Sequence, residues 1–246
     1  MTTPLAHDIH GEGQPRVLLI HGWLTSRAVW SEVHPLLGDI GPVLVPDLHG
    51  FGETGGSPDD TLDSHVKDLL GLLDAIGADK LSVVGHSMGG AVAQRLAVEA
   101  PERVEKLVLV ASVPASGFPL PPEAYAQFDS LGGNREALEG FFQPQFADPA
   151  VLPTFVDVAM QASAEAAKST LKAWTGASFA ERLSDLVAPT LVIAGGDDPY
   201  LTPEILQQTV VDRIAGATIA TVDGGGHYAQ VDQPSAVAKL ICDHIS

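Results

Sequence analysis

The segment Gly85–Gly90 (GHSMGG) places Ser87 between two glycines, directly after the apolar run Leu81–Val84 and before the helix-like segment Gly89–Ala100. A serine on such a sharp strand-to-helix turn is held in a strained backbone, and glycines beside it let strand and helix pack closely. The turn exposes the hydroxyl and directs the N-terminal end of the helix at any negative charge that forms there. The pattern alone is weak in a chain with 25 glycines. Its context favours a catalytic nucleophile over a serine that only caps the helix.

A serine hydroxyl is a poor nucleophile at neutral pH and needs a base within hydrogen-bond reach. Of the nine histidines, His227 follows three glycines in the segment Asp223–Tyr228, so its loop can turn tightly and return the ring to the sheet edge. His86 adjoins the serine, but neighbouring side chains on such a turn point apart. His21 and His49 follow earlier strands, where hydrogen bonds to loop backbone are the favoured role. We therefore predict that His227 is the base.

An imidazole base needs a carboxylate that fixes its tautomer and stabilises the imidazolium. Asp197 and Asp198 follow the apolar run Thr190–Ala194, at the sheet edge where the histidine is expected. We predict Asp198 as the partner and Asp197 as a cap of the following turn, with the reverse assignment left open. The order serine, acid, histidine along the chain is the one that strand–turn–helix hydrolases use.

A tetrahedral intermediate also needs donors for its oxyanion. The backbone N–H of Met88, the residue after the nucleophile, is one predicted donor. The other is the backbone N–H of Trp23, in the loop His21–Leu24 that follows the apolar run Val17–Ile20. The Trp23 indole is also expected to line the acyl pocket, although simple packing is an alternative and the two roles can coexist.

Short apolar runs with helical segments between them must position these residues. The runs are nearly continuous, which indicates strands buried on both faces, and their alternation with helices predicts a parallel sheet wrapped by helices. A short antiparallel first strand is expected near Leu5–Ile9. The predicted strands are Val17–Ile20, Val43–Val45, Leu81–Val84, Val104–Val110, Thr190–Ala194 and the weaker Ala217–Val222; the helices include Thr61–Ile76, Gly89–Ala100 and Pro203–Ile214.

Residues 113–188 interrupt this alternation, because 76 residues without a strand signal are far more than a crossover needs. Four helical patterns fill them, so we predict a helical cap (lid) inserted into a core domain formed by residues 1–112 and 189–246. Extra core helices are the alternative. Aromatic residues of the cap are expected to form its own core for the most part, and the predicted substrate-binding residues are Trp23, Phe118, Phe142, Phe146 and Trp174.

Together these motifs resemble the α/β-hydrolase superfamily over nearly the whole chain, and most closely its small bacterial carboxylesterases. The resemblance implies the α/β-hydrolase fold: a mostly parallel central sheet flanked by helices, with the cap inserted after the sixth strand. His49 departs from the pattern, since proline is more usual there. The motifs that carry the resemblance are His21-Gly22-Trp23 for the oxyanion loop, Asp47–Gly52 for a strand-end turn, Gly85–Gly90 for the nucleophile, Gly195–Pro199 for the acid and Gly226-His227 for the base.

The resemblance implies hydrolysis of small, largely apolar carboxylic esters through an acyl-enzyme. Lactonases, C–C bond hydrolases and perhydrolases of this fold work with the same serine, histidine and aspartate, and these three activities remain alternatives. Epoxide hydrolases and haloalkane dehalogenases carry an aspartate where this chain has Ser87. A ligand-sensing receptor that retains the fold is a further alternative, because fold alone does not determine function.

Composition narrows the class of partners. The 246 residues include 31 acidic and 13 basic side chains, a formal net charge of -18. Such a surface repels nucleic acid and anionic lipid, which leaves a small-molecule substrate as the expected partner. The single cysteine, Cys242, excludes an intrachain disulfide. We expect a cytoplasmic monomer or homodimer without metal or cofactor, because no signal peptide, membrane-spanning stretch or metal-ligand spacing is recognisable.

Overall fold

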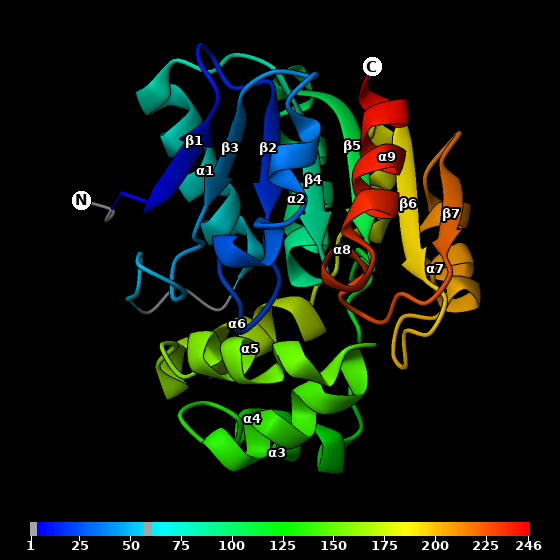
Figure 1. Ribbon diagram of the computed structural model, residues 1–246. Coiled ribbons are helices and arrows are strands. Elements are labelled where there is room, and N and C mark those ends of the chain that lie inside the picture. The colour runs from blue at the N-terminus through cyan, green and yellow to red at the C-terminus, as the bar shows by residue number, and fades with distance from the viewer. Residues whose placement is uncertain (1–3, 57–60) are drawn as a thin grey trace.

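A seven-stranded sheet forms the centre of the computed structural model, which describes residues 4–56 and 61–246 (Figure 1). The strand order is β1-β3-β2-β4-β5-β6-β7, with β1 antiparallel to β3 and all other neighbouring pairs parallel. The antiparallel first strand and the parallel sheet are thus as predicted. The strands are β1 (His7–His10), β2 (Val17–Ile20), β3 (Val43–Pro46), β4 (Leu81–His86), β5 (Val104–Val110), β6 (Thr190–Gly195) and β7 (Thr218–Val222).

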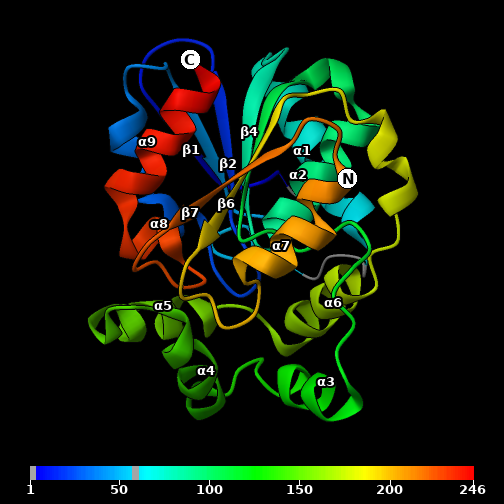
Figure 2. The ribbon, with the colours of Figure 1, turned by 90° about the vertical axis from the view of Figure 1, so that its right-hand side faces the viewer.

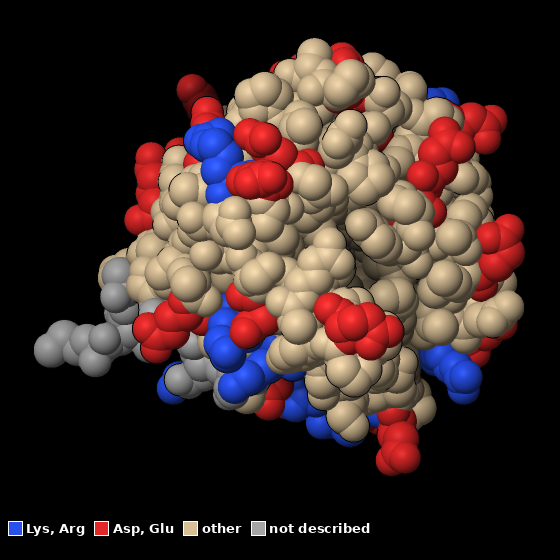
Figure 3. Space-filling view, turned by 90° about the horizontal axis from the view of Figure 1, so that it is seen from below, with Lys and Arg blue, Asp and Glu red and all other residues tan. Residues whose placement is uncertain are grey.

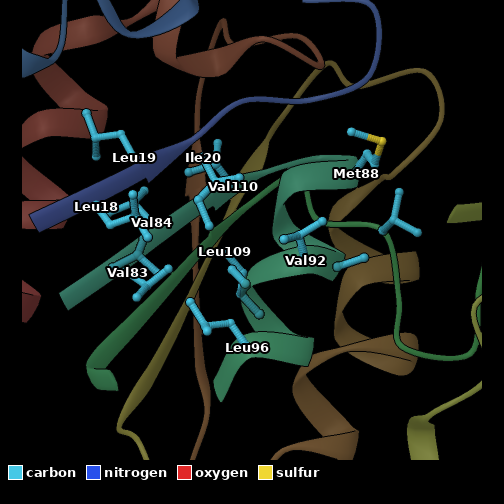
Figure 4. Packing of buried hydrophobic residues seen from close by; sticks show 14 of the residues in the cluster. Leu18, Leu19, Ile20, Val83, Val84, Met88, Val92, Leu96, Leu109 and Val110 are labelled. Carbon is cyan, nitrogen blue, oxygen red and sulfur yellow. The ribbon is translucent and has the colours of Figure 1, made fainter. Parts of the chain in front are cut away.

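The central strands are apolar because helices cover both faces of the sheet. Every residue of β2, β3, β4 and β6 is buried, whereas the edge strands β1 and β7 keep partly exposed positions. Figure 2 shows α1 (Leu62–Ile76) and α2 (Met88–Glu99) on one face and α9 (Pro234–Ile245) on the other. Buried side chains of β2, β4, β5 and α2 pack together in the hydrophobic core (Figure 4).

Local sequence signals set the ends of several helices. Helix α1 begins after Thr61, whose side chain accepts a hydrogen bond from the Ser64 N–H. The helix ends at Gly77, which has a left-handed conformation with φ 71°. Helix α7 (Pro203–Thr209) is shorter than the predicted helix Pro203–Ile214, because the backbone of Val210 leaves helical geometry. Helix α8 spans Ala229–Asp232, and 3-10 helices span Arg27–Trp30, His34–Leu37, Pro101–Arg103, Gln143–Gln145, Pro149–Val151, Ala180–Asp185 and Val211–Arg213.

Residues 113–188, called the insertion below, lie between β5 and β6 and contain four α-helices. These are α3 (Pro122–Asp129), α4 (Arg135–Phe142), α5 (Leu152–Ala159) and α6 (Ala164–Thr175). The insertion lies beyond the carboxyl ends of the parallel strands (Figures 1 and 2). Its predicted position after a sixth strand is not confirmed: in the described chain it follows the fifth, because β1 is the single strand that precedes β2.

Candidate active site

Ser87 forms the sharp turn between β4 and α2, and its backbone is strained there. Its φ is 52° and its ψ is -119°, a conformation that residues with a side chain rarely adopt. Hydrogen bonds hold it: the Ser87 N–H donates to the Val110 carbonyl at 3.0 Å, and the Ser87 carbonyl accepts from the N–H groups of Gly90 and Val113 at 2.9 and 3.0 Å. The hydroxyl is therefore presented by a backbone that the surrounding sheet and helix keep in place.

Two glycines are required by the close packing around this turn. A Cβ added at Gly89 would lie 2.2 Å from the His21 carbonyl oxygen, and one at Gly85 would lie 2.4 Å from the Gly89 carbonyl oxygen. Both distances are far below van der Waals contact, so a larger residue would push the strand, the helix and the His21 loop apart. The spacing of glycines seen in the sequence is thus explained by backbone contacts.

His227 connects Ser87 to Asp198 through two hydrogen bonds. The His227 Nε2 lies 3.0 Å from the Ser87 Oγ, and its Nδ1 lies 2.8 Å from the Asp198 Oδ2. The His227 ring and the Asp198 carboxylate are buried, and the Asp198 side chain is fully excluded from solvent. If Nδ1 carries the proton and donates it to the carboxylate, Nε2 is left as the acceptor that faces the serine hydroxyl. The structure thus brings the three predicted residues together in one chain of hydrogen bonds.

The environment keeps Asp198 charged. Burial raises the pKa of its carboxyl, but the charge and hydrogen bond of His227, together with the backbone N–H groups of Tyr200 and Leu201, outweigh burial and hold the pKa below its usual value. Those two N–H groups donate to Oδ1 at 2.8 and 3.0 Å. Asp197 is exposed and its own N–H donates to the Gly225 carbonyl. The expectation that Asp197 caps the turn is wrong, because Asp198 itself accepts both bonds.

His86 was expected to point away from the serine, and its ring contacts the backbone of the histidine loop. Its Nε2 donates to the backbone carbonyl of His227 at 3.0 Å, and the two rings lie 5.0 Å apart between centroids. Burial and the nearby His227 lower the pKa of His86 well below its usual value, so the ring is neutral. Sequence reasoning missed this contact, which joins residues 141 positions apart; the only signal was a histidine directly before the nucleophile.

His21 has the backbone role predicted for it. Its Nδ1 donates to the Gly22 carbonyl at 2.8 Å, and its Nε2 accepts from the Leu48 N–H at 2.9 Å. Because both ring nitrogens are engaged, the ring ties the loop after β2 to the turn after β3. His49, in contrast, contacts a side chain: its Nδ1 lies 3.3 Å from the Asp68 carboxylate.

The two predicted oxyanion donors flank the serine. Met88 is the first residue of α2, where a helix leaves its backbone N–H groups without partners of its own. The loop with Trp23 adjoins Ser87, since a Cβ added at Gly22 would lie 3.2 Å from the Ser87 Cβ. The following residue, Leu24, has a left-handed backbone with φ 56°. Both main-chain segments therefore lie beside Ser87, and their role as oxyanion donors stays a prediction.

An apolar cavity of about 230 Å³ opens at Ser87 and His227. Among the described residues that line it, His227 is the only ionisable side chain apart from two tyrosines, and no lysine, arginine, aspartate or glutamate takes part. Trp23, Phe118 and Trp174 line it as predicted. Phe128 and Phe141 line it as well. The lining residues that the sequence did not single out are Val113, Leu120, Ala124, Gln145, Tyr200, Leu201 and Tyr228.

Phe142 and Phe146 were predicted to bind substrate and do not line the cavity. Phe142 is completely buried and packs against Phe146 and Phe155, with ring centroids 6.3 and 6.1 Å apart. Successive residues of a helix point about 100° apart. The neighbour Phe141 therefore faces the cavity while Phe142 faces the core of the insertion, and a sequence pattern cannot tell which of two adjacent aromatics does which.

The face formed by the insertion is mostly uncharged around a central hollow, with acidic side chains scattered over it (Figure 3). In the described part of the chain no cluster of three or more His, Cys, Asp or Glu side chains has the geometry of a metal site. No helix within residues 4–56 and 61–246 is long and apolar enough to cross a bilayer. The candidate site therefore consists of the hydrogen-bonded serine, histidine and aspartate and of the apolar cavity beside them.

The sequence places this arrangement in a known family. Residues 17–240 match the model of the alpha/beta hydrolase family. The chain belongs to this family. The predicted α/β-hydrolase fold is therefore confirmed, apart from the strand after which the insertion begins. The proteins that this chain resembles are named hydrolases, which also makes it a hydrolytic enzyme.

The relatives of this α/β hydrolase differ in their named substrates. It is 30% identical to the 2-hydroxymuconate semialdehyde hydrolase of a Pseudomonas species, over 98% of this chain and 89% of that protein. It is 31% identical to the lipase LipV of Mycobacterium tuberculosis, over 93% of this chain and 92% of that protein. A solved esterase from Thermogutta terrifontis superposes with a TM-score of 0.81 at 28% identity, covering 97% of this chain and 92% of that one. Family membership alone thus leaves the substrate open.

Proposed function

We propose that this protein cleaves carboxylic ester bonds of small, largely apolar substrates through an acyl-enzyme on Ser87. One observation carries the proposal. Ser87, His227 and Asp198 are joined by hydrogen bonds, and Ser87 and His227 line a cavity whose other walls are almost entirely apolar and aromatic side chains. A buried base beside a partly buried hydroxyl at the cavity supplies the nucleophile, and the apolar walls favour a neutral acyl group.

Acylation begins when the Ser87 Oγ attacks the ester carbonyl carbon and its proton passes to the His227 Nε2. The carbonyl oxygen becomes an oxyanion, which the backbone N–H groups of Met88 and Trp23 stabilise. Asp198 stabilises the imidazolium through the bond to Nδ1. The tetrahedral intermediate collapses as the carbon–oxygen bond to the alcohol breaks, and the Nε2 proton moves to the departing oxygen.

Deacylation uses the same groups with water in place of the alcohol. His227 Nε2 removes a proton from a water molecule, whose oxygen attacks the acyl carbon. The second tetrahedral intermediate breaks its bond to the Ser87 Oγ, which regains a proton from Nε2. The net reaction consumes one water and releases the carboxylic acid, and no step needs a metal or a cofactor.

We propose further that the insertion, residues 113–188, is the cap of this site, and that residues 1–112 and 189–246 are the catalytic core domain. The cavity supports this division, because its catalytic walls come from the core whereas Phe118, Phe128, Phe141 and Trp174 come from the insertion. Substrate therefore contacts both parts at once. A cap of this kind excludes water from the acyl group and selects its size and shape.

The cavity favours a neutral ester over the substrate named for the Pseudomonas relative. A muconate carries carboxylate charge, and a buried carboxylate needs a cationic or hydrogen-bonding partner. The described lining residues include no lysine or arginine to supply one. The strongly negative chain, with its formal net charge of -18, adds long-range repulsion of anions.

A substrate panel tests the proposed function. p-Nitrophenyl butyrate and a p-nitrophenyl ester of similar length that ends in a carboxylate would be compared, with a simple lactone and a 6-oxo-dienoate as representatives of the alternative reactions. We expect the neutral ester to exceed the anionic ester by about 100-fold in kcat/KM, the factor that about 2.7 kcal/mol of carboxylate desolvation supplies. Preferred turnover of the dienoate, or ester turnover that survives Ser87→Ala, would contradict the proposal. Cytoplasmic location and a monomeric or homodimeric state stay predictions of the sequence.

A further inference from the structure

The Trp23 indole is held by the insertion, although its backbone belongs to the loop after β2. Its Nε1 donates to the hydroxyl of Thr170 at 2.9 Å and to the backbone carbonyl of Ala167 at 3.1 Å, both on α6. All three groups are buried. A hydrogen bond shielded from water in this way holds a side chain in one orientation, because breaking it leaves a buried donor unsatisfied.

Aromatic side chains from three helices of the insertion enclose the same indole. Phe128 of α3 stacks on it at 5.8 Å between ring centroids, Phe141 of α4 meets it edge-on at 5.9 Å, and Trp174 of α6 lies 5.7 Å away. The side chain of the predicted oxyanion residue is thus surrounded by the insertion. Movement of the insertion relative to the core would therefore act on this residue directly.

The peptide that carries the Trp23 N–H is held from the core through its carbonyl group. The Gly22 carbonyl accepts from the His21 Nδ1 at 2.8 Å and from the Thr25 hydroxyl at 3.0 Å. The residue after Trp23, Leu24, has a left-handed backbone with φ 56°. The anchored indole adds a second constraint on the Trp23 backbone, and this one comes from the insertion.

The Thr170 hydroxyl is oriented to accept from the indole. Its single proton is donated to the Ala166 carbonyl one helical turn earlier, at 2.6 Å, which leaves an oxygen lone pair for the Trp23 N–H. Helix α6 thereby fixes the direction of the acceptor. A serine at this position would keep both bonds, whereas a valine of nearly the same shape would keep neither.

Resting on the proposed ester hydrolysis, we propose that Thr170 is a positioning residue: it ties the oxyanion loop to the insertion, so that packing of α6 against the core helps to align the Trp23 N–H. The assembly of the oxyanion site is then coupled to closure of the insertion over substrate. Thr170 touches neither the reacting atoms nor the residues that exchange protons. It acts on the reaction through the indole alone.

The test compares Thr170→Val with Thr170→Ser and with the matched control Thr175→Val. Thr175 is also buried on α6 and donates to the Leu171 carbonyl at 2.7 Å, whereas the indole donates to Ala167 and Thr170. We expect Thr170→Val to lower kcat for p-nitrophenyl butyrate about tenfold with little change in KM, because a full oxyanion donor is worth about 100-fold or more and the Ala167 bond remains. Thr170→Ser should keep at least half of the wild-type kcat, and the kcat of Thr175→Val should lie within about twofold of wild type.

Two further readouts separate positioning from a loss of packing. Affinity for a trifluoromethyl ketone, whose adduct with serine carries an oxyanion, should fall in parallel with kcat in Thr170→Val and in no control. The indole N–H resonance of Trp23, measured by nuclear magnetic resonance, should shift in Thr170→Val and not in Thr175→Val. An unchanged kcat in Thr170→Val, or equal losses in both valine variants, would overturn the positioning role. A wild-type enzyme that hydrolyses no neutral ester would refute the proposed function itself, and this role with it.

Discussion

Replacement of Asp198 by asparagine should impair catalysis far more than the loss of one negative charge suggests. The Asp198 Oδ1 accepts from the N–H groups of Tyr200 and Leu201, and Oδ2 accepts from the His227 Nδ1. In Asp198→Asn the side-chain oxygen must face the two backbone donors, because the opposite orientation would place an NH₂ group against them. The NH₂ group then faces His227.

That orientation reverses the tautomer of the base. A donor opposite Nδ1 requires Nδ1 to accept, so the proton moves to Nε2, which then faces the Ser87 hydroxyl as a donor and cannot take its proton. The same substitution in another triad lowers kcat on the order of 10⁴-fold, which corresponds to about 5.4 kcal/mol of transition-state stabilisation. We expect a loss of similar size here, because the structure offers the asparagine one orientation only.

The assay is release of p-nitrophenol from p-nitrophenyl butyrate under saturating conditions, with Asp197→Asn as the matched control. Asp197 is the adjacent residue, carries the same charge and is exposed, so its variant should remain within about twofold of wild type. Thermal unfolding of both variants checks that the fold is retained. A kcat of Asp198→Asn within tenfold of wild type, or a larger loss in Asp197→Asn, would refute the reasoning from hydrogen bonds to tautomer.

Two further predictions concern stability and packing. Burial lowers the pKa of His65 to about 3, and neither ring nitrogen has a hydrogen-bond partner among the described residues. Once the pH falls below the usual 6.5, the unfolded chain therefore binds a proton at this residue that the folded chain does not bind. Urea unfolding should therefore show about 2 kcal/mol of lost stability between pH 7 and pH 5 from this residue, a loss that His65→Leu removes and that an unchanged pH dependence would disprove. Gly89→Ala should abolish most activity by driving its Cβ into the His21 carbonyl, whereas Gly140→Ala, with open space around it on α4, should remain active; an active Gly89→Ala enzyme would show that the turn can relax.

Features that depend on short stretches of sequence were predictable. The glycines around Ser87 indicate a turn because their spacing matches a local backbone requirement, and the observed φ of 52° shows that turn. The apolar runs predicted the buried strands, since a strand covered on both faces has no polar positions to alternate with. The choice of Asp198 followed from the place of the acid loop after a strand, and the structure brings this residue, not Asp197, to the histidine.

Features that depend on contacts between distant segments were not predictable. The rotation of α4 decides that Phe141 faces the cavity and Phe142 the interior, and that rotation is set by packing against other helices. The bond from His86 to the His227 carbonyl joins the end of β4 to the loop after β7, 141 positions later in the chain. The strand count before the insertion was taken from the resemblance, and this chain has one strand fewer there.

Trapping of the acyl-enzyme tests the central claim most directly. Wild-type enzyme mixed briefly with p-nitrophenyl butyrate, quenched in acid and digested, should show the mass of one butyryl group on the peptide that contains Ser87, together with a burst of p-nitrophenol equal to the enzyme concentration where deacylation is the slower step. A Ser87→Ala enzyme should show neither the adduct nor turnover. Butyryl found on another residue, or turnover that persists in Ser87→Ala, would contradict the account.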